Sequence, residues 1–181
     1  DKGTKKFYDL RMYDSNYPHD DIVSDLKESF IKSSNVGIAS LSQERFGKKE
    51  ASKEYYQYLG QFGLLEKSGI DLVGEPDPYI KNPSKDQSWS GVTIPWMAHG
   101  YELQITPLQT LAFYNAVAND GVYMNPRLVK TIREGEKVVR EFKPTVKRKR
   151  IASEENIEIL QELMQETVLR GTGKNIYTEE Y

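Results

Sequence analysis

Residues 100–109 read Gly100-Tyr101-Glu102-Leu103-Gln104-Ile105-Thr106-Pro107-Leu108-Gln109 and carry the sharpest structural signal in this sequence of 181 residues. Thr106 suits the N-cap of a helix, Pro107 suits its first position, and Gln109 completes a capping box. The predicted helix runs to about Asn119, and Gly121 ends it. Apolar residues lie on most of its circumference, so we expect it to be the central helix of the core.

Three helices are predicted upstream of this stretch, after an irregular or extended entry over residues 1–19. The first begins at the N-cap residue Asp20. Its apolar stripe has helical spacing and consists of Ile22, Val23, Leu26 and Phe30. The second predicted helix covers residues 36–46 and the third covers residues 50–62. The N-terminal part of the chain is therefore expected to be largely helical.

Residues 69–100 are rich in proline and glycine and are predicted to form a long loop. A loop of this length inside a compact domain is more often functional than idle. Disorder is the alternative. Four large apolar residues that favour burial argue against disorder: Trp89, Ile94, Trp96 and Met97.

A β-hairpin and a last helix are predicted downstream. Residues 128–133 and 137–142 flank a short turn that contains Gly135, which is typical of a hairpin. Its strands are largely polar on one face, so we expect it at the surface. Ser153 suits the N-cap of a helix that ends near Arg170 and Gly171.

Composition excludes several kinds of protein and site. The sequence has 25 Lys and Arg and 27 Asp and Glu, which gives a net charge of −2. The chain as a whole therefore has no positive potential that would attract nucleic acid. With no cysteine, disulfides, thiolate catalysis and cysteine-ligated zinc are excluded, and two histidines 80 positions apart argue against a histidine metal site. The longest apolar run has four residues, 111–114, so we expect a soluble chain without a membrane span or leader. The cysteine count fits both an exported and a cytosolic protein.

Two charged patterns are better explained by structure than by chemistry. The basic run Lys147–Arg150 has no interleaved aromatic residues, which favours a solvated loop over a phosphate-binding site. Two S-x-x-K spacings, Ser24/Lys27 and Ser29/Lys32, could place a base one turn from a serine. They occur about as often as chance predicts, and they lie on the charged part of an amphipathic helix. We therefore expect no nucleophile there.

Ser33 and Asn35 form the pattern S-x-N at the junction between two predicted helices. A hydroxyl there can relay a proton, and an amide can hold a lysine or a substrate carbonyl. Taken alone, this pattern is far more often a helix cap. His99 is a conceivable general base, but the sequence favours a packing or cleft-lining role, and His19 is expected at the surface.

In combination, these motifs resemble a known family. Ser33-Ser34-Asn35-Val36-Gly37 resembles the second active-site motif of the penicillin-binding transpeptidases, and residues 100–109 resemble the G-Y-x-L-x-x-T-P-L-Q segment of class B members. The hairpin, the last helix and Gly171-Thr172-Gly173-Lys174-Asn175 follow in the order of the family. Ser88-Trp89-Ser90-Gly91 with Pro95-Trp96 is similar to septal, cell-division members, especially those of Bacteroidetes-type bacteria. The likeness covers about residues 20–175.

The resemblance implies an α+β, mostly helical fold, namely the helical part of a penicillin-binding, β-lactamase-like serine transpeptidase domain with a surface β-hairpin. It implies that the parent enzyme acylates a serine with the D-Ala-D-Ala end of a peptidoglycan stem peptide and passes the acyl group to an amine. β-Lactams mimic the donor and trap the acyl-enzyme. No cofactor and no metal are implied.

The resemblance also assigns roles to residues. Ser33 would help to carry protons to the leaving amine, and Asn35 would hold the catalytic lysine and the substrate amide. Gly100 and Tyr101 match positions that form a wall of the cleft, with His99 beside them. Glu102 departs from the glycine that is common at its position.

A cellular setting follows from the same likeness. The parent protein would be anchored by an N-terminal helix at the periplasmic face of the inner membrane. Its partners would be divisome proteins, including a septal glycosyltransferase, and nucleic acid is not among them.

Two motifs of the family are missing from residues 1–181, the S-x-x-K that carries the nucleophile upstream of S-x-N and the K-T-G downstream. Lys130-Thr131-Ile132 is not K-T-G. We therefore expect an inner part of a transpeptidase domain, inactive on its own. The alternative is a non-catalytic scaffold or interaction module that keeps the helical subdomain, and binding of nucleic acid through residues 147–150 is a weaker third hypothesis.

Overall fold

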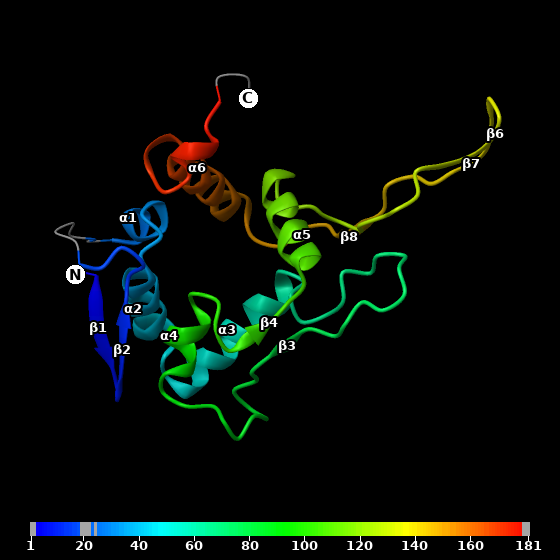
Figure 1. The fold of residues 1–181 in the computed structure, drawn as a ribbon. Coiled ribbons are helices and arrows are strands. Elements are labelled where there is room, and N and C mark those ends of the chain that lie inside the picture. The colour runs from blue at the N-terminus through cyan, green and yellow to red at the C-terminus, as the bar shows by residue number, and fades with distance from the viewer. Residues whose placement is uncertain (1–2, 19–22, 24, 179–181) are drawn as a thin grey trace. The chain divides into compact units, whose positions relative to one another are not determined.

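The computed structural model describes residues 3–18, 23 and 25–178 (Figure 1). The chain forms two compact units. The first unit contains Asp1–Tyr58, Ile80–Leu103 and Ile159–Tyr181, and the second contains Leu59–Tyr79 and Gln104–Glu158. Both helices and short two-stranded antiparallel sheets occur along the chain, so the predicted α+β class is confirmed.

The first unit opens with a β-hairpin made of β1 (Thr4–Phe7) and β2 (Leu10–Tyr13). The strands are antiparallel, and Thr4 pairs with Tyr13. Phe7 and Met12 are buried against Val36 and Ala39 of helix α2 (Asn35–Phe46). The sequence prediction of an irregular or extended entry is thus narrowed to a hairpin, because two apolar side chains anchor it to the core.

Helix α1 (Leu26–Ile31) differs from its prediction. It begins at Leu26, because the Asp25 side chain accepts a hydrogen bond from the Glu28 N–H at 2.9 Å and acts as the N-cap. The predicted N-cap Asp20 and Ile22 lie outside the described residues. The predicted stripe is wrong at Leu26, which is exposed, and the helix buries Ser29 and Ile31 instead.

Helices α2 (Asn35–Phe46) and α3 (Lys49–Gln61) confirm the two helices predicted at residues 36–46 and 50–62. Ser34 is the N-cap of α2, and its Oγ accepts from the Gly37 N–H at 2.9 Å. The predicted long loop at residues 69–100 contains β3 (Tyr79–Ile80) and the short helix α4 (Thr93–Met97). Ile94 and Met97 are buried, and Trp96 packs on the cluster around Val36, so this part of the loop is anchored rather than disordered.

Helix α5 (Pro107–Ala118) follows β4 (Leu103–Gln104) and has the predicted capping box. Thr106 Oγ1 accepts from the Gln109 N–H at 3.1 Å, and Gln109 Oε1 accepts from the Thr106 N–H at 2.7 Å. The expectation of a helix buried on most sides is wrong for the described residues. Leu111 is 64% exposed, and the buried face consists of Gln109, Ala112, Ala116 and Val117.

The second unit continues with short strands. β5 (Tyr123–Met124) pairs with β8 (Val146–Arg148), and β6 (Thr131–Glu134) pairs with β7 (Lys137–Glu141). The β6–β7 pair is the predicted hairpin, and its residues lie at the surface as expected (Figure 1). Helix α6 (Glu154–Arg170) follows, and its residues from Ile159 onward belong to the first unit, as does the 3₁₀ helix η1 (Lys174–Ile176).

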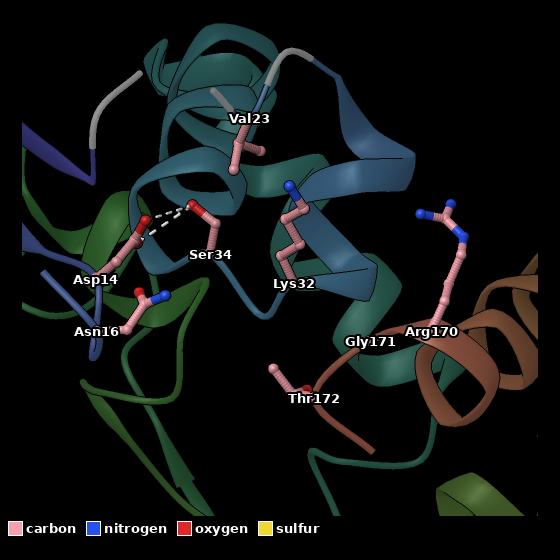
Figure 2. Close-up of a pocket in the computed structure, with 8 residues that line it drawn as sticks. All are labelled: Asp14, Asn16, Val23, Lys32, Ser34, Arg170, Gly171 and Thr172. Carbon is pink, nitrogen blue, oxygen red and sulfur yellow. Dashed lines mark hydrogen bonds between the residues drawn. The ribbon is translucent and has the colours of Figure 1, made fainter. Parts of the chain in front are cut away.

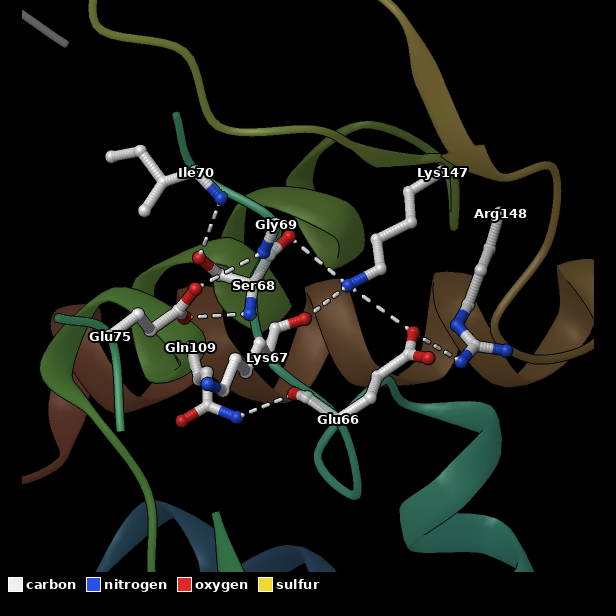
Figure 3. A network of polar contacts seen from close by, with 9 residues as sticks. All are labelled: Glu66, Lys67, Ser68, Gly69, Ile70, Glu75, Gln109, Lys147 and Arg148. Atoms are coloured by element: carbon white, nitrogen blue, oxygen red, sulfur yellow. Dashed lines mark hydrogen bonds and ion pairs between the residues drawn. The ribbon is translucent and has the colours of Figure 1, made fainter. Parts of the chain in front are cut away.

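A polar network around Glu66 holds the second unit together (Figure 3). The Glu66 carboxylate lies 3.2 Å from Lys147 Nζ and 2.8 Å from the Arg148 guanidinium, and Lys147 also donates to the Ser68 carbonyl. Partial burial raises the pKa of Glu66, but the two cations lower it more, so its pKa lies below the usual value. The interpretation of residues 147–150 as a solvated loop is therefore wrong for Lys147, whose side chain is only 16% exposed.

Gln109 joins this network through its other amide atom. It is fully buried, and its Nε2 donates to the Glu66 carbonyl at 2.8 Å (Figure 3). One side chain thus both caps α5 and fixes the segment after α3. A glutamine at this position is needed for both contacts, because an acceptor and a donor must point in opposite directions.

Replacing Gln109 by alanine should lower the free energy of unfolding by about 2–3 kcal/mol, since it removes half of a capping box and leaves buried polar groups unpaired. Urea denaturation followed by circular dichroism measures this change. Gln57→Ala, at an exposed position of α3, is the matched control and should shift the free energy by about 0.5 kcal/mol or less. Equal effects of the two variants would contradict the proposed role of Gln109.

Candidate active site

The S-x-N pattern lies where α1 ends and α2 begins, as the sequence predicted. Ser33 has a left-handed backbone with φ of 52°, and its N–H donates to the Phe30 carbonyl. The Ser34 N–H donates to the Ser29 carbonyl at 2.9 Å. This tight turn leaves the Ser33 side chain exposed and buries that of Ser34.

Asp14, at the end of the N-terminal hairpin, holds this junction from behind. Its carboxylate is buried, accepts from Ser34 Oγ at 3.0 and 3.2 Å, and accepts from the Val36 N–H at 2.9 Å (Figure 2). A carboxylate is favourable there, because the first N–H groups of a helix have no partner within the helix and carry partial positive charge. Sequence reasoning missed Asp14, since an acid 20 residues away from the N-cap gives no local signal.

Asn35 and Ser33 contact different parts of the first unit. Asn35 Nδ2 donates to the Tyr13 carbonyl at 3.2 Å, which ties the amide to the same hairpin. Ser33 Oγ lies 2.7 Å from Thr172 Oγ1, a residue 139 positions later in the chain. Thr172 was also missed as a contact of the site, although its segment was noted as similar to the family.

A small cavity lies beside the junction (Figure 2). Its volume is about 240 Å³. Eight residues line it: Asp14, Asn16, Val23, Lys32, Ser34, Arg170, Gly171 and Thr172. Six of the eight lining residues have polar or charged side chains, and the lining comes from the hairpin and the residues after it, the α1–α2 junction and the end of α6.

His99, Gly100 and Tyr101 lie together just after α4. His99 Nδ1 is 2.9 Å from the Pro95 carbonyl, and its ring centroid is 5.1 Å from that of Tyr101. Gly100 has a φ of 101° and open space around it, which fits a turn that few other residues adopt. Within the described residues, no hydrogen bond or ring contact joins these three residues to Ser33 or Asn35. The two groups are linked indirectly, since α4 packs on α2 through Trp96.

The S-x-x-K spacings have the structural role that the sequence favours. Ser29 is buried and donates to the Asp25 carbonyl at 2.6 Å, and Lys27 pairs with Glu162 at 2.6 Å. Ser24 lies outside the described residues. A buried, hydrogen-bonded serine cannot reach a substrate, so Ser29 is not a nucleophile in this structure.

Among the described residues, no group of three His, Cys, Asp or Glu residues is placed to hold a metal ion. No described helix is both long and apolar enough to cross a membrane. The junction presents an exposed Ser33 hydroxyl and the Asn35 amide, while the buried Asp14 carboxylate binds Ser34 and the Val36 N–H beside them.

Replacing Asp14 by alanine should lower the free energy of unfolding by about 3 kcal/mol, because the Ser34 hydroxyl and the Val36 N–H lose a charged acceptor in a buried place. Chemical denaturation of the chain measures this change. Asp9→Ala, an exposed acid in the turn of the same hairpin, should change stability by about 0.5 kcal/mol at most. A wild-type unfolding curve for the Asp14 variant would mean that the carboxylate does not hold the junction.

Comparison with known proteins identifies relatives of this chain. The family model described as the penicillin-binding protein transpeptidase domain matches residues 1–180. The penicillin-binding protein PbpB of Mycolicibacterium smegmatis is 34% identical over 160 residues, which is 84% of this chain and 23% of the relative. PbpB of Mycobacterium tuberculosis is 42% identical over 101 residues, 56% of this chain and 14% of the relative. The chain therefore spans less than a quarter of the length of these relatives.

The comparison with solved structures points to the same family. Penicillin-binding protein 3 of Mycobacterium tuberculosis, in its apo form, has a TM-score of 0.78 and 29% sequence identity, over 98% of this chain and 39% of that one. The same protein complexed with aztreonam has a TM-score of 0.72 and 28% identity, over 94% of this chain and 36% of that one. The class B resemblance seen in the sequence is confirmed, and its Bacteroidetes-type detail stays a prediction. With Ser33 and Asn35 at the α1–α2 junction and a family match over nearly every residue, the chain belongs to the penicillin-binding protein transpeptidase domain family.

Proposed function

We propose that this chain supplies the S-x-N motif and the helical part of a peptidoglycan D,D-transpeptidase. The observation that carries the proposal is the junction itself, where buried Asp14 binds Ser34 and the Val36 N–H and thereby fixes the backbone that carries Ser33 and Asn35. The Ser33 side chain is exposed, and the Asn35 amide donates to the Tyr13 carbonyl. If the junction served only to cap α2, Ser34 alone would suffice, because its Oγ is the side-chain atom that accepts from the Gly37 N–H. The flanking residues Ser33 and Asn35 are not needed for this cap, and we assign the chemistry to them.

The proposed reaction is an acyl transfer in two steps. A serine outside this chain attacks the carbonyl carbon that precedes the terminal D-Ala of a stem peptide. The carbon–nitrogen bond breaks, the nitrogen takes a proton and D-Ala leaves. An amine of a second stem peptide then attacks the resulting ester, loses a proton and releases the serine. Both steps move a proton between an amine and an oxygen.

Ser33 and Asn35 have distinct roles in this proposal. The Ser33 hydroxyl passes the proton to the leaving amine, because a hydroxyl can accept one proton while it donates another. Asn35 presents an amide to the catalytic lysine and to the substrate carbonyl. Its hydrogen bond to the Tyr13 carbonyl fixes one N–H, which leaves the second N–H and the oxygen for these partners.

Gly100, Tyr101 and His99 are proposed to form one wall of the substrate cleft. Tyr101 is well exposed, Gly100 leaves open space, and His99 is fixed by Pro95 and the neighbouring rings. The ligands proposed for this cleft are the stem peptide and the β-lactams that resemble its D-Ala-D-Ala end. Support for β-lactams comes from the M. tuberculosis relative, which has been solved with aztreonam and with ampicillin.

The proposed setting is septal cell-wall synthesis at the periplasmic face of the inner membrane. Divisome proteins, including a septal glycosyltransferase, are the proposed partners of the parent protein, which an N-terminal helix would anchor. The similarity of Ser88-Trp89-Ser90-Gly91 and Pro95-Trp96 to septal members supports this setting.

A fluorescent penicillin tests the proposed activity. The full-length protein that contains these residues should become covalently labelled, and excess unlabelled ampicillin should prevent the labelling. The chain of residues 1–181 alone should remain unlabelled, because the S-x-x-K motif that the family has upstream of S-x-N is missing from it, and Ser29, which has a lysine at that spacing, is buried. A labelled short chain would put the nucleophile within residues 1–181, and an unlabelled full-length protein would favour the non-catalytic scaffold.

Substitutions test the assigned residues. Ser33→Ala and Asn35→Ala in the full-length protein should each slow acylation by penicillin by about 100-fold, the usual size of an acid–base contribution. Stopped-flow or gel-based labelling at several drug concentrations measures the rate. Ser42→Ala, a partly buried serine on the same helix, should acylate like the wild type. A Ser33 variant as fast as that control would remove Ser33 from the mechanism.

A further inference from the structure

The segment that follows α6 reaches the Ser33 hydroxyl from a distant part of the sequence. Thr172 Oγ1 lies 2.7 Å from Ser33 Oγ, and either hydroxyl can be the donor. Figure 2 shows Arg170, Gly171 and Thr172 at the end of α6, beside the α1–α2 junction. This is the usual distance for a hydrogen bond between two hydroxyl groups.

Backbone contacts fix this segment against α1. The Thr172 N–H donates to the Ile31 carbonyl at 3.3 Å, and the Gly173 N–H donates to the Thr167 carbonyl at 3.0 Å. A Cβ at position 171 would lie 2.2 Å from the Ile31 carbonyl oxygen, far inside contact distance. Only glycine allows the two backbones to approach so closely.

Ion pairs join the same two helices along their length. Arg170 pairs with Glu28 at 2.9 Å, and Lys27 pairs with Glu162 at 2.6 Å. Exposed pairs contribute little stability individually. Together with the backbone contacts, they set the distance and rotation of α6 relative to α1 and thereby the place of Thr172.

The Ser33 hydroxyl needs a hydrogen-bond partner that fixes its orientation. Ser33 is exposed, and a serine hydroxyl can take three staggered positions around its Cα–Cβ bond. Threonine is β-branched and restricted at χ1, so a threonine held by its backbone presents its hydroxyl in few directions. A hydrogen bond from such a group selects one rotamer of Ser33.

We propose that Thr172 is a positioning residue for Ser33, one that holds the serine hydroxyl in the rotamer from which it passes protons. The proposal rests on the proposed function. Thr172 acts through Ser33 rather than on the substrate, so it should affect the rate of acylation and leave drug binding unchanged. Asp14 holds the neighbouring Ser34 from the opposite side, and the two contacts together fix the junction.

The test compares Thr172→Val, which replaces the hydroxyl by a methyl group, with Thr172→Ser, which keeps it. Acylation of the full-length protein by a fluorescent penicillin is followed over a range of drug concentrations. Thr172→Val should lower the maximal acylation rate by about 3- to 10-fold, the worth of one exposed hydrogen bond, with the half-saturating concentration unchanged. Thr172→Ser should recover most of the lost rate.

Thr167→Val is the matched control, because Thr167 lies on α6 and its hydroxyl bonds the Leu163 carbonyl rather than Ser33. It should acylate at the wild-type rate. Thermal melting of each variant checks folding, and Thr172→Ala replaces the valine variant if valine lowers the melting temperature. A wild-type protein that takes no label overturns the proposed function. A labelled wild type with an equally fast Thr172→Val, or a loss that Thr172→Ser does not reverse, overturns the role of Thr172.

Discussion

The hydrogen bonds of the Asp14 carboxylate are the contacts on which the first unit depends. One side chain satisfies the first turn of α2, binds the cap residue Ser34 and fastens the β1–β2 hairpin to the helix. With the hairpin in place, Phe7 and Met12 pack on Val36 and Ala39 and complete the small core on which Trp96 rests. The exposed parts of the S-x-N motif then project from a surface that is fixed from beneath. The buried Asp14 carboxylate therefore fixes the position of this site, and the residues to which we assign its chemistry, Ser33 and Asn35, flank the serine that it binds.

The features that sequence predicts well here are local. The capping box of α5 needs only Thr106 and Gln109, three residues apart, and it forms as predicted. The β6–β7 hairpin and helices α2 and α3 are likewise specified by residues within one turn or one strand of each other. Placement of S-x-N at a helix junction also follows from short-range pattern, because Ser33-Ser34-Asn35 interrupts an apolar periodicity.

The features that sequence misses depend on distant partners or on competing signals. Asp14 and Thr172 lie 20 and 139 residues from the serines that they bind, and no periodicity connects them. The start of α1 was misplaced because Asp20 and Asp25 are equally good caps by type, and only the folded chain selects Asp25. Lys147 lies in a basic run and was expected to be solvated, yet its side chain pairs with Glu66, 81 positions earlier, and is only partly exposed. Polar contacts that form only in the folded chain decide each of these cases.

The close approach of Gly171 to the Ile31 carbonyl has a consequence for how this region can change over generations. Every amino acid that a single base change can put in place of glycine carries a Cβ, and each would push the end of α6 away from α1. A threonine codon, by contrast, reaches serine in one step with its hydroxyl kept. Substitutions that keep the junction intact are thus excluded at position 171 and possible at position 172. Gly171, which has no side chain, is therefore the residue of this segment that tolerates substitution least.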